Sequence, residues 1–231
     1  MIKVNRPIPA DKIKLVIFDL DGTLVDSRLD LANSINAMLR HYGKTELPCD
    51  VISGYIGDGA PMLVRRALGD PDDEKFVAEA LTHFLGWYRE HKLDNTYVYA
   101  GVKEALAAIA RPGNGGGRKM AVLTNKPVRP SQMIVDALGL GGFFTQVYGG
   151  NSFHTKKPDP EGARVLFAEY GVSPEDAVMV GDSEIDVLTA RNTGMYSVGL
   201  SYGFAPHTLA HVPPDVLVDT PEEMAQVLAT K

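Results

Sequence analysis

Two aspartates that directly follow an apolar run are the first residues whose type and spacing indicate chemistry. Residues 15–18 (Leu-Val-Ile-Phe) predict a short buried strand, and Asp19 and Asp21 come immediately after it. Because burying an unpaired charge is unfavourable, the strand must end near Asp19 and present both carboxylates at its carboxyl end. Ligands bind at that end of the strands in open α/β sheets. The two aspartates therefore mark a candidate site.

Carboxylates this close together need a compensating group. Both remain ionised only where a cation lies between them; otherwise one keeps a proton. Mg²⁺ prefers carboxylate oxygens, backbone carbonyls and water as ligands, so Asp19 and Asp21 predict a metal site, an acid–base pair, or both. A strand-end turn with solvated aspartates is the alternative. It is weakened by the Gly22-Thr23 that follows, because the whole string is uncommon at average composition.

Polar residues also follow the predicted strand at residues 120–123. Thr124 and Asn125 come directly after it, and a hydroxyl and backbone amides at a strand end can bind phosphate oxygens. Further on, Lys156-Lys157 precede Pro158-Asp159-Pro160. The prolines stiffen the backbone, and a rigid mount suits a lysine that must hold one position. A solvated basic turn is the alternative for this segment.

A second acidic pair follows the predicted strand at residues 177–180. Asp182 and Asp186 are four residues apart, so a helix that starts after Asp182 turns both toward one face. The alternative is that they are acids favoured at a helix N-terminus by the macrodipole. That alternative explains one acid well, but not the whole set after a buried strand.

The four motifs, taken in order, resemble those of the haloacid dehalogenase superfamily of phosphohydrolases. The resemblance implies Asp19 as the nucleophile, Asp21 as the general acid and base, and Lys157 as the cation that balances their charge. It implies that Mg²⁺ is bound by Asp19, the Asp21 backbone carbonyl and Asp182. It also implies that the phosphoryl group is bound by Thr124 and Asn125, and that the lysine or a metal-bound water is oriented by Asp186.

Residues 55–68 resemble the cap segment of bacterial phosphoglycolate phosphatases. This implies a Mg²⁺-dependent phosphatase acting on a small, doubly anionic phosphorylated substrate, 2-phosphoglycolate. Gly57 would allow a tight turn whose backbone can approach such a ligand. Arg65 or Arg66 would reach the substrate carboxylate, although an exposed helix-face arginine is the commoner situation.

The hydrophobic pattern predicts an α/β protein with a Rossmann-like parallel sheet core and an inserted all-helical cap domain. Apolar strands alternate with helices after about residue 97, and a block that reads as helical throughout falls between the first strand and the rest. The core domain is expected at residues 1–25 and 97–231, and the cap at residues 26–96. A long helix is expected at about residues 72–91, with an apolar side made of Phe76, Ala80, Phe84, Trp87 and Tyr88.

Composition narrows the class of partner. The 231 residues carry a formal net charge of −6 with no basic stripe, which argues against a nucleic-acid partner. No run approaches the roughly 18 apolar residues of a membrane span, and the start of the chain lacks a signal-peptide core. The single Cys49 fits a reducing cytoplasm. We expect a cytoplasmic monomer or homodimer, with a surface loop at the glycine-rich residues 113–117.

Other functions remain open at this stage. The same motifs fit a phosphotransferase such as a sugar-phosphate mutase, a broad-specificity sugar-phosphate phosphatase, or a pyrophosphatase. A non-catalytic phospho-acceptor module also places aspartates and a lysine at the edge of a parallel sheet. The sizeable helical block and the pairing of Asp19 with Asp21 argue against that last class.

Overall fold

The computed structural model describes residues 1–111 and 118–229, and the glycine-rich segment at 113–117 lies outside them. The chain divides into two compact units. The first, here called the core unit, comprises Met1–Val25 and Val98–Lys231, and the second, the helical unit, comprises Asp26–Tyr97. The second unit thus interrupts the first in sequence.

A seven-stranded sheet forms the centre of the core unit. Its strand order is β1-β9-β8-β7-β2-β5-β6, and all neighbours run parallel except β1 and β9. β2 lies between β5 and β7, so Leu15 is opposite Lys119 on one side and Ala177 on the other. The strands are β1 (Lys3–Val4), β2 (Leu15–Phe18), β5 (Lys119–Leu123), β6 (Gln146–Tyr148), β7 (Ala177–Gly181), β8 (Tyr196–Leu200) and β9 (Val216–Val218).

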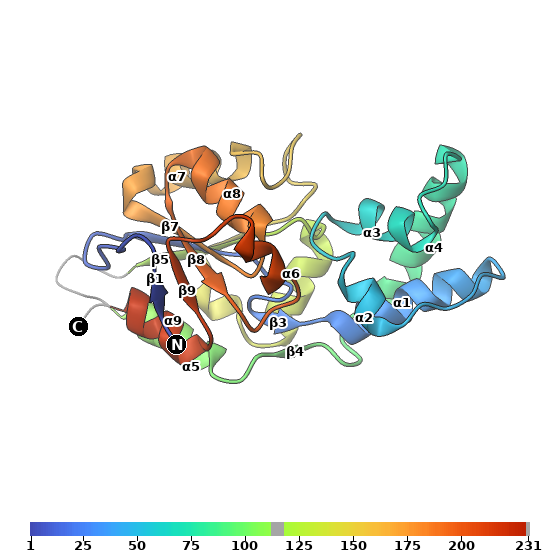
Figure 1. Ribbon diagram of the computed structural model, residues 1–231, viewed down its shortest axis with the longest axis horizontal. Helices are drawn as coiled ribbons and strands as arrows, with labels where there is room; N and C mark the ends of the chain where they lie inside the picture. Colours follow the sequence, from blue (N-terminus) through green and yellow to red (C-terminus); the bar gives the residue numbers. More distant parts are fainter. Residues whose placement is uncertain (112–117, 230–231) are drawn as a thin grey trace. The chain divides into compact units, whose positions relative to one another are not determined.

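Helices cover both faces of this sheet, as its continuous apolar strands require. Figure 1 shows α7 and α8 on one face and α5 and α9 on the other. Alternate residues of each strand point to opposite faces, and Leu15 and Ile17 pack with Leu166 and Phe167 of α7. The predicted α/β class is confirmed. The helices are α5 (Val102–Ala110), α6 (Val128–Ala137), α7 (Glu161–Tyr170), α8 (Glu184–Thr193) and α9 (Pro221–Leu228), with 3₁₀ turns η1 (Gly141–Phe143), η2 (Pro174–Asp176) and η3 (Pro206–Ala210).

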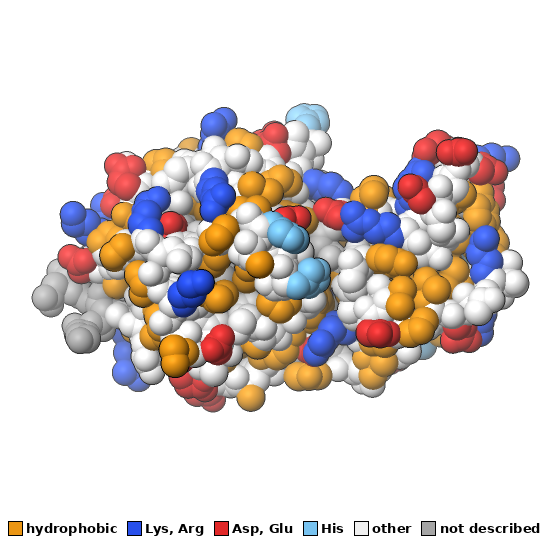
Figure 2. All heavy atoms as spheres, viewed as in Figure 1, with side chains coloured by type: hydrophobic (Ala, Val, Ile, Leu, Met, Phe, Trp, Pro, Cys, Tyr) orange, Lys and Arg blue, Asp and Glu red, His pale blue; other side chains and the backbone are white. Residues whose placement is uncertain are grey.

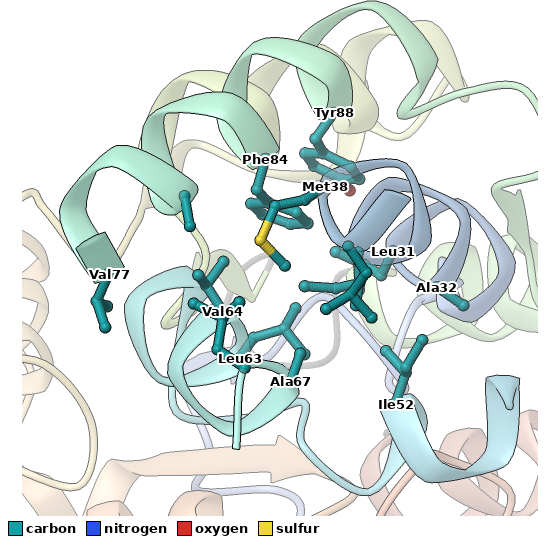
Figure 3. Packing of buried hydrophobic residues seen from close by; sticks show 14 residues of the cluster. Leu31, Ala32, Met38, Ile52, Leu63, Val64, Ala67, Val77, Phe84 and Tyr88 are labelled. Atoms are coloured by element: carbon teal, nitrogen blue, oxygen red, sulfur yellow. The ribbon is translucent and has the colours of Figure 1, made fainter. Parts of the chain in front are cut away.

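The helical unit packs four helices around its own apolar cluster (Figure 3). It contains α1 (Arg28–His41), α2 (Cys49–Ser53), α3 (Ala60–Ala67) and α4 (Glu74–His91). The chain enters it through β3 (Val25–Asp26) and leaves through β4 (Tyr97–Val98), and these two strands pair. The buried residues of α4 are Val77, Ala80, Phe84 and Tyr88. The prediction for Trp87 was wrong: its side chain is 40% exposed and stacks on His91.

A buried carboxylate fixes the end of the helical unit to its beginning. Asp30 on α1 is 1% exposed and accepts hydrogen bonds from two residues that follow α4. The donors are the backbone N–H and side-chain amide of Asn95, at 3.0 and 2.8 Å, and the backbone N–H and hydroxyl of Thr96, at 2.8 and 2.7 Å. These charge-assisted bonds hold the exit segment against α1.

Surface charge on the core unit is mixed. On the face shown in Figure 2, its Lys and Arg side chains are separated by acidic and hydrophobic ones rather than gathered into a stripe. Across residues 1–111 and 118–229, no helix combines the length and the apolar composition that crossing a bilayer demands.

Replacing Asp30 by Ala should lower the free energy of unfolding by about 3 kcal/mol, because it leaves the two buried donors of Thr96 and the partly buried donors of Asn95 without an acceptor. Urea unfolding followed by circular dichroism measures this. Asp73→Ala is the matched control, since Asp73 accepts one exposed N-cap bond from Phe76 and its loss should cost about 1 kcal/mol. Equal losses in the two variants would contradict the role given to Asp30.

Candidate active site

The sheet order brings three predicted site residues to one edge. Asp19, Thr124 and Asp182 directly follow β2, β5 and β7, which are neighbours in the sheet. The backbone there continues the strand ladder, because Asp19 N–H donates to the Val180 carbonyl at 2.9 Å and Thr124 N–H to the Tyr148 carbonyl at 3.0 Å. Parallel strands end at the same edge, so residues distant in sequence meet at this one place.

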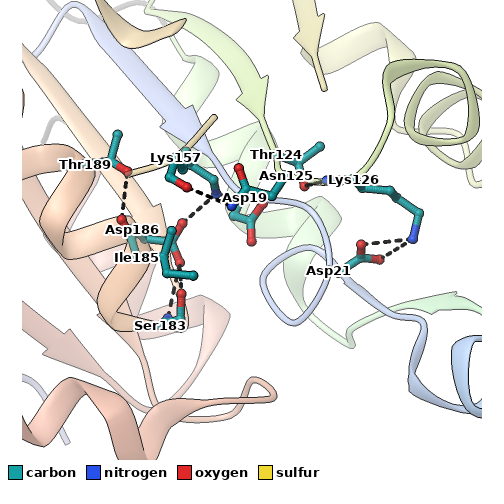
Figure 4. Close-up of polar contacts among 10 residues, drawn as sticks. All are labelled: Asp19, Asp21, Thr124, Asn125, Lys126, Lys157, Ser183, Ile185, Asp186 and Thr189. Atoms are coloured by element: carbon teal, nitrogen blue, oxygen red, sulfur yellow. Dashed lines mark hydrogen bonds and ion pairs between the residues drawn. The ribbon is translucent and has the colours of Figure 1, made fainter. Parts of the chain in front are cut away.

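A buried lysine joins two of the acids at this edge. Lys157 Nζ lies 2.9 Å from Asp19 Oδ1 and 2.6 Å from Asp186 Oδ1, and its side chain is 2% exposed (Figure 4). Burial by itself would lower the pKa of Lys157, but the charges of Asp186 and Asp19 outweigh it and raise that pKa. The lysine is therefore cationic at neutral pH.

Asp186 is positioned by its own helix start as well as by the lysine. Its Oδ2 accepts the backbone N–H of Ser183 at 3.2 Å and the Ser183 hydroxyl at 2.8 Å, at the beginning of α8. A Cβ at Gly181 would come within 2.1 Å of the Asp186 carboxyl carbon, so only glycine leaves room for this arrangement. Asn125 adds a bond from its side-chain amide to the Lys157 carbonyl, at 3.0 Å. Lys157 is thus held at its ammonium group by Asp19 and Asp186 and at its backbone carbonyl by Asn125.

Asp182 is also buried, and it is held by backbone donors. It is 3% exposed, and its Oδ2 accepts the backbone N–H groups of Phe204 and Ala205, at 2.6 and 3.1 Å. Burial raises the pKa of Asp182 to about 7, and the charges of Asp186 and Asp19 add to the effect. Burial likewise raises the pKa of Asp19 to about 6, against the lowering effect of Lys157. Negative charge at this edge is thus only partly compensated by the lysine.

This acidic cluster fits a hard divalent cation. Asp19, Asp182 and Asp186 each offer one carboxylate oxygen, and these oxygens lie within 4.8 Å of one another. Glycines let the backbone pack closely against Asp182: a Cβ at Gly22 would lie 2.5 Å from Asp182 Oδ2, and one at Gly203 would lie 2.2 Å from Asp182 Cβ. An all-oxygen donor set is what Mg²⁺ or Ca²⁺ takes, and neutralising it would reverse the raised pKa values.

The Asp21 carboxylate takes a different partner, one that the sequence analysis missed. Figure 4 shows it turned toward Lys126, whose Nζ lies 3.0 Å from Asp21 Oδ1 and 2.9 Å from Oδ2. Lys126 belongs to the same loop as Thr124 and Asn125, directly after β5. The position of Lys126 after a predicted strand could have indicated a site residue, but one lysine after a strand forms no motif by itself.

Gly57, Arg65 and Arg66 belong to the helical unit. Gly57 has a φ of 128° and precedes Gly59, with a φ of 87°, so the expected glycine-dependent turn is present. The Arg65 guanidinium donates to the Pro71 carbonyl at 2.9 Å and pairs with Glu74 at 2.5 Å. Arg66 donates to the Tyr55 carbonyl at 3.2 Å and pairs with Asp58 at 2.5 Å. Both guanidinium groups therefore have partners within their own unit.

A parallel sheet whose carboxyl edge gathers several aspartates around one buried lysine is an arrangement suited to phosphoryl chemistry. The family model described as haloacid dehalogenase-like hydrolase matches residues 16–200, from β2 to the end of β8. The chain belongs to this family. The resemblance inferred from the four motifs is confirmed.

Within this family, the chain is similar to proteins that carry a specific name. The chain is 40% identical over 196 residues to a phosphoglycolate phosphatase of Pseudomonas syringae pv. tomato, covering 83% of this chain and 70% of that one. It is 38% identical to a phosphoglycolate phosphatase of Psychrobacter arcticus, covering 83% and 84%. The crystal structure of a predicted phosphoglycolate phosphatase from Haemophilus somnus superposes with a TM-score of 0.85 at 32% identity, covering 94% of this chain and 98% of that one.

Asp182→Asn should weaken the pH dependence of stability when divalent cations are removed. Folding raises the pKa of Asp182 from 3.8 to about 7, so its contribution to stability is full below about pH 4 and is lost as the pH rises through 7. The wild-type free energy of unfolding should therefore fall between about pH 5 and about pH 7.5 in EDTA. In the variant the fall should be smaller.

Urea unfolding at the two pH values measures the difference. Asp72→Asn is the control, because Asp72 is exposed in the helical unit and should leave the wild-type pH dependence unchanged. An Asp182→Asn protein with the same pH dependence as wild type would contradict the assignment.

Proposed function

We propose that this protein is a Mg²⁺-dependent phosphatase that hydrolyses a small phosphate monoester, 2-phosphoglycolate, to glycolate and phosphate. The observation that carries the proposal is the buried Lys157 held between Asp19 and Asp186, beside the acids of the cluster. Membership of the hydrolase family and the names of the relatives support the same reaction class and substrate.

In the first step the Asp19 carboxylate attacks phosphorus and forms an aspartyl-phosphate, while Asp21 gives a proton to the leaving glycolate oxygen. With a pKa of about 6, Asp19 is mostly ionised at neutral pH and available as a nucleophile. In the second step Asp21 takes a proton from water, whose oxygen attacks phosphorus. Phosphate leaves and the Asp19 carboxylate is regenerated.

The remaining residues at the sheet edge hold charge in place. Lys157 balances the negative charge of Asp19 and of the phosphoryl oxygens; at about 4 Å a unit charge pair contributes roughly 4 kcal/mol at an effective dielectric constant of 20. Asp186 keeps the lysine in position through the 2.6 Å bond to Nζ. The Thr124 hydroxyl and the Asn125 backbone amide bind the phosphoryl oxygens.

We assign the Mg²⁺ ligands to the carboxylates of Asp19 and Asp182 and the backbone carbonyl of Asp21. Asp186 completes the acidic cluster, but its two oxygens already accept bonds from Lys157 and Ser183, which favours a positioning role. When bound, the ion supplies positive charge that neutralises phosphoryl oxygens against the incoming nucleophile.

We further propose that the two compact units correspond to a catalytic core domain, expected at residues 1–25 and 97–231, and a cap domain, expected at residues 26–96; Tyr97 belongs to the helical unit in the structure. Within the cap, Gly57 and either Arg65 or Arg66 are candidates for substrate contact. A substrate carboxylate would have to compete with Glu74 for Arg65 and with Asp58 for Arg66. We propose a cytoplasmic location and a monomeric or homodimeric enzyme; the single, free Cys49 supports the reducing compartment.

Asp19→Asn should lower kcat by at least about 10³-fold, because an amide oxygen is a poor nucleophile toward phosphorus. The measurement is phosphate release from 2-phosphoglycolate with Mg²⁺, together with mass spectrometry of rapidly quenched wild-type enzyme for a phosphorylated Asp19. Exposed Asp72→Asn is the control and should retain wild-type turnover. Normal turnover of the Asp19→Asn protein would refute the nucleophile assignment.

Among small phosphate esters, 2-phosphoglycolate should give the highest kcat/KM. A panel that includes hexose phosphates and pyrophosphate measures this, with each substrate supplied alone and no added acceptor. Steady release of inorganic phosphate under those conditions is expected of a hydrolase, whereas a phosphotransferase would need a second substrate. Equal rates across the panel would remove the assignment of this substrate.

A further inference from the structure

The ion pair between Lys126 and Asp21 places a cation beside the residue proposed to act as general acid. Lys126 Nζ contacts both carboxylate oxygens, at 3.0 and 2.9 Å. The two side chains are 5% and 11% exposed. Because moving a charge out of water is unfavourable, a lysine this buried is expected only where its charge interacts with a partner or a ligand.

The backbone of Lys126 is firmly held, and four methylene groups separate it from the ammonium. The Lys126 N–H donates to the Thr124 hydroxyl at 3.3 Å, and its carbonyl accepts from Gly150 N–H at 2.8 Å. A Cβ at Gly149 would come within 2.6 Å of that carbonyl, so the loop after β6 packs directly against it. Four flexible methylene groups then carry the ammonium to Asp21.

The chemistry of the proposed substrate explains why a cation belongs here. In 2-phosphoglycolate one methylene group separates the ester oxygen from the carboxylate. A group that gives its proton to the ester oxygen, as Asp21 is proposed to do, therefore has the carboxylate close beside it. Lys157 does not offer a second cation for that carboxylate, because its Nζ is shared by Asp19 and Asp186.

We propose that Lys126 binds the carboxylate of the substrate and determines specificity for carboxylate-bearing phosphate esters. In the free enzyme it bonds to the Asp21 carboxylate; when substrate binds, the ammonium transfers its bonds to the substrate carboxylate. Asp21 is then released to turn toward the ester oxygen. This inference rests on the proposed function and adds to it a residue of the core unit that recognises the substrate carboxylate.

The test compares 2-phosphoglycolate with ethyl phosphate, which has a methyl group in place of the carboxylate. In Lys126→Met, kcat/KM for 2-phosphoglycolate should fall by about 10- to 100-fold, chiefly through KM, as expected for loss of a charge-assisted bond. The value for ethyl phosphate should change by much less. Lys126→Arg, which keeps the charge, should retain most of the preference for 2-phosphoglycolate.

Lys14→Met is the matched control. Lys14 also pairs with an aspartate, Asp176, at 2.6 Å, but it precedes β2 at the opposite edge of the sheet, so the ratio of the two kcat/KM values should stay at the wild-type value. Lys126→Gln, which lacks the charge but can still donate to Asp21, replaces the Met variant if thermal unfolding shows that the latter is not folded.

Three outcomes are distinguishable. Loss of the preference in the uncharged variants and its retention in Lys126→Arg support the inference. Equal losses on both esters in every Lys126 variant overturn it and leave the proposed function standing, because the lysine then only holds Asp21. A wild-type enzyme that releases phosphate from neither ester overturns the proposed function itself.

Discussion

Accumulated negative charge at one buried sheet edge is the constraint on which the rest of this structure depends. Asp19, Asp182 and Asp186 each bring a carboxylate to within 4.8 Å of the others, and burial raises the pKa of the first two to about 6 and about 7. Lys157 offsets part of this charge by pairing with two of the three. Because the carboxylates carry more negative charge than Lys157 offsets, this edge of the sheet is suited to bind a divalent cation.

The order of the strands decides which side chains share that edge. β2 lies between β5 and β7, and the chain runs outward on one side to β6 before it returns to the other side at β7. This reversal places the ends of three neighbouring strands around one point, where ligands bind in such sheets. The glycines next to the acids then set how closely they approach, as Gly181 does for Asp186. The strand order thus determines which side chains are neighbours, and glycines determine how closely those side chains approach.

Much of this could be predicted from the sequence, because buried apolar strands that end in acids leave a strong local pattern. The class of fold and the three central strands β2, β5 and β7, expected at residues 15–18, 120–123 and 177–180, could be predicted from apolar runs followed by polar residues. The short β1 could not, since two exposed residues carry no apolar signal. Trp87 was misassigned because neighbouring positions on α4 differ by about 100° in direction. Lys126 and Asp30 were missed because their partners, Asp21 and the Asn95–Thr96 segment, are distant in sequence.

Pairing of β2 with β7 also has a consequence for how the protein is made. Leu15 lies opposite Ala177, so the central strand finds one of its two partners only after most of the chain has left the ribosome. Contacts of such long sequence separation slow folding. Until that pairing forms, Asp182 and Asp186 are not beside Asp19. In a nascent or truncated chain that ends before β7, the backbone of β2 therefore lacks one of its two partner strands, and the acidic cluster cannot form.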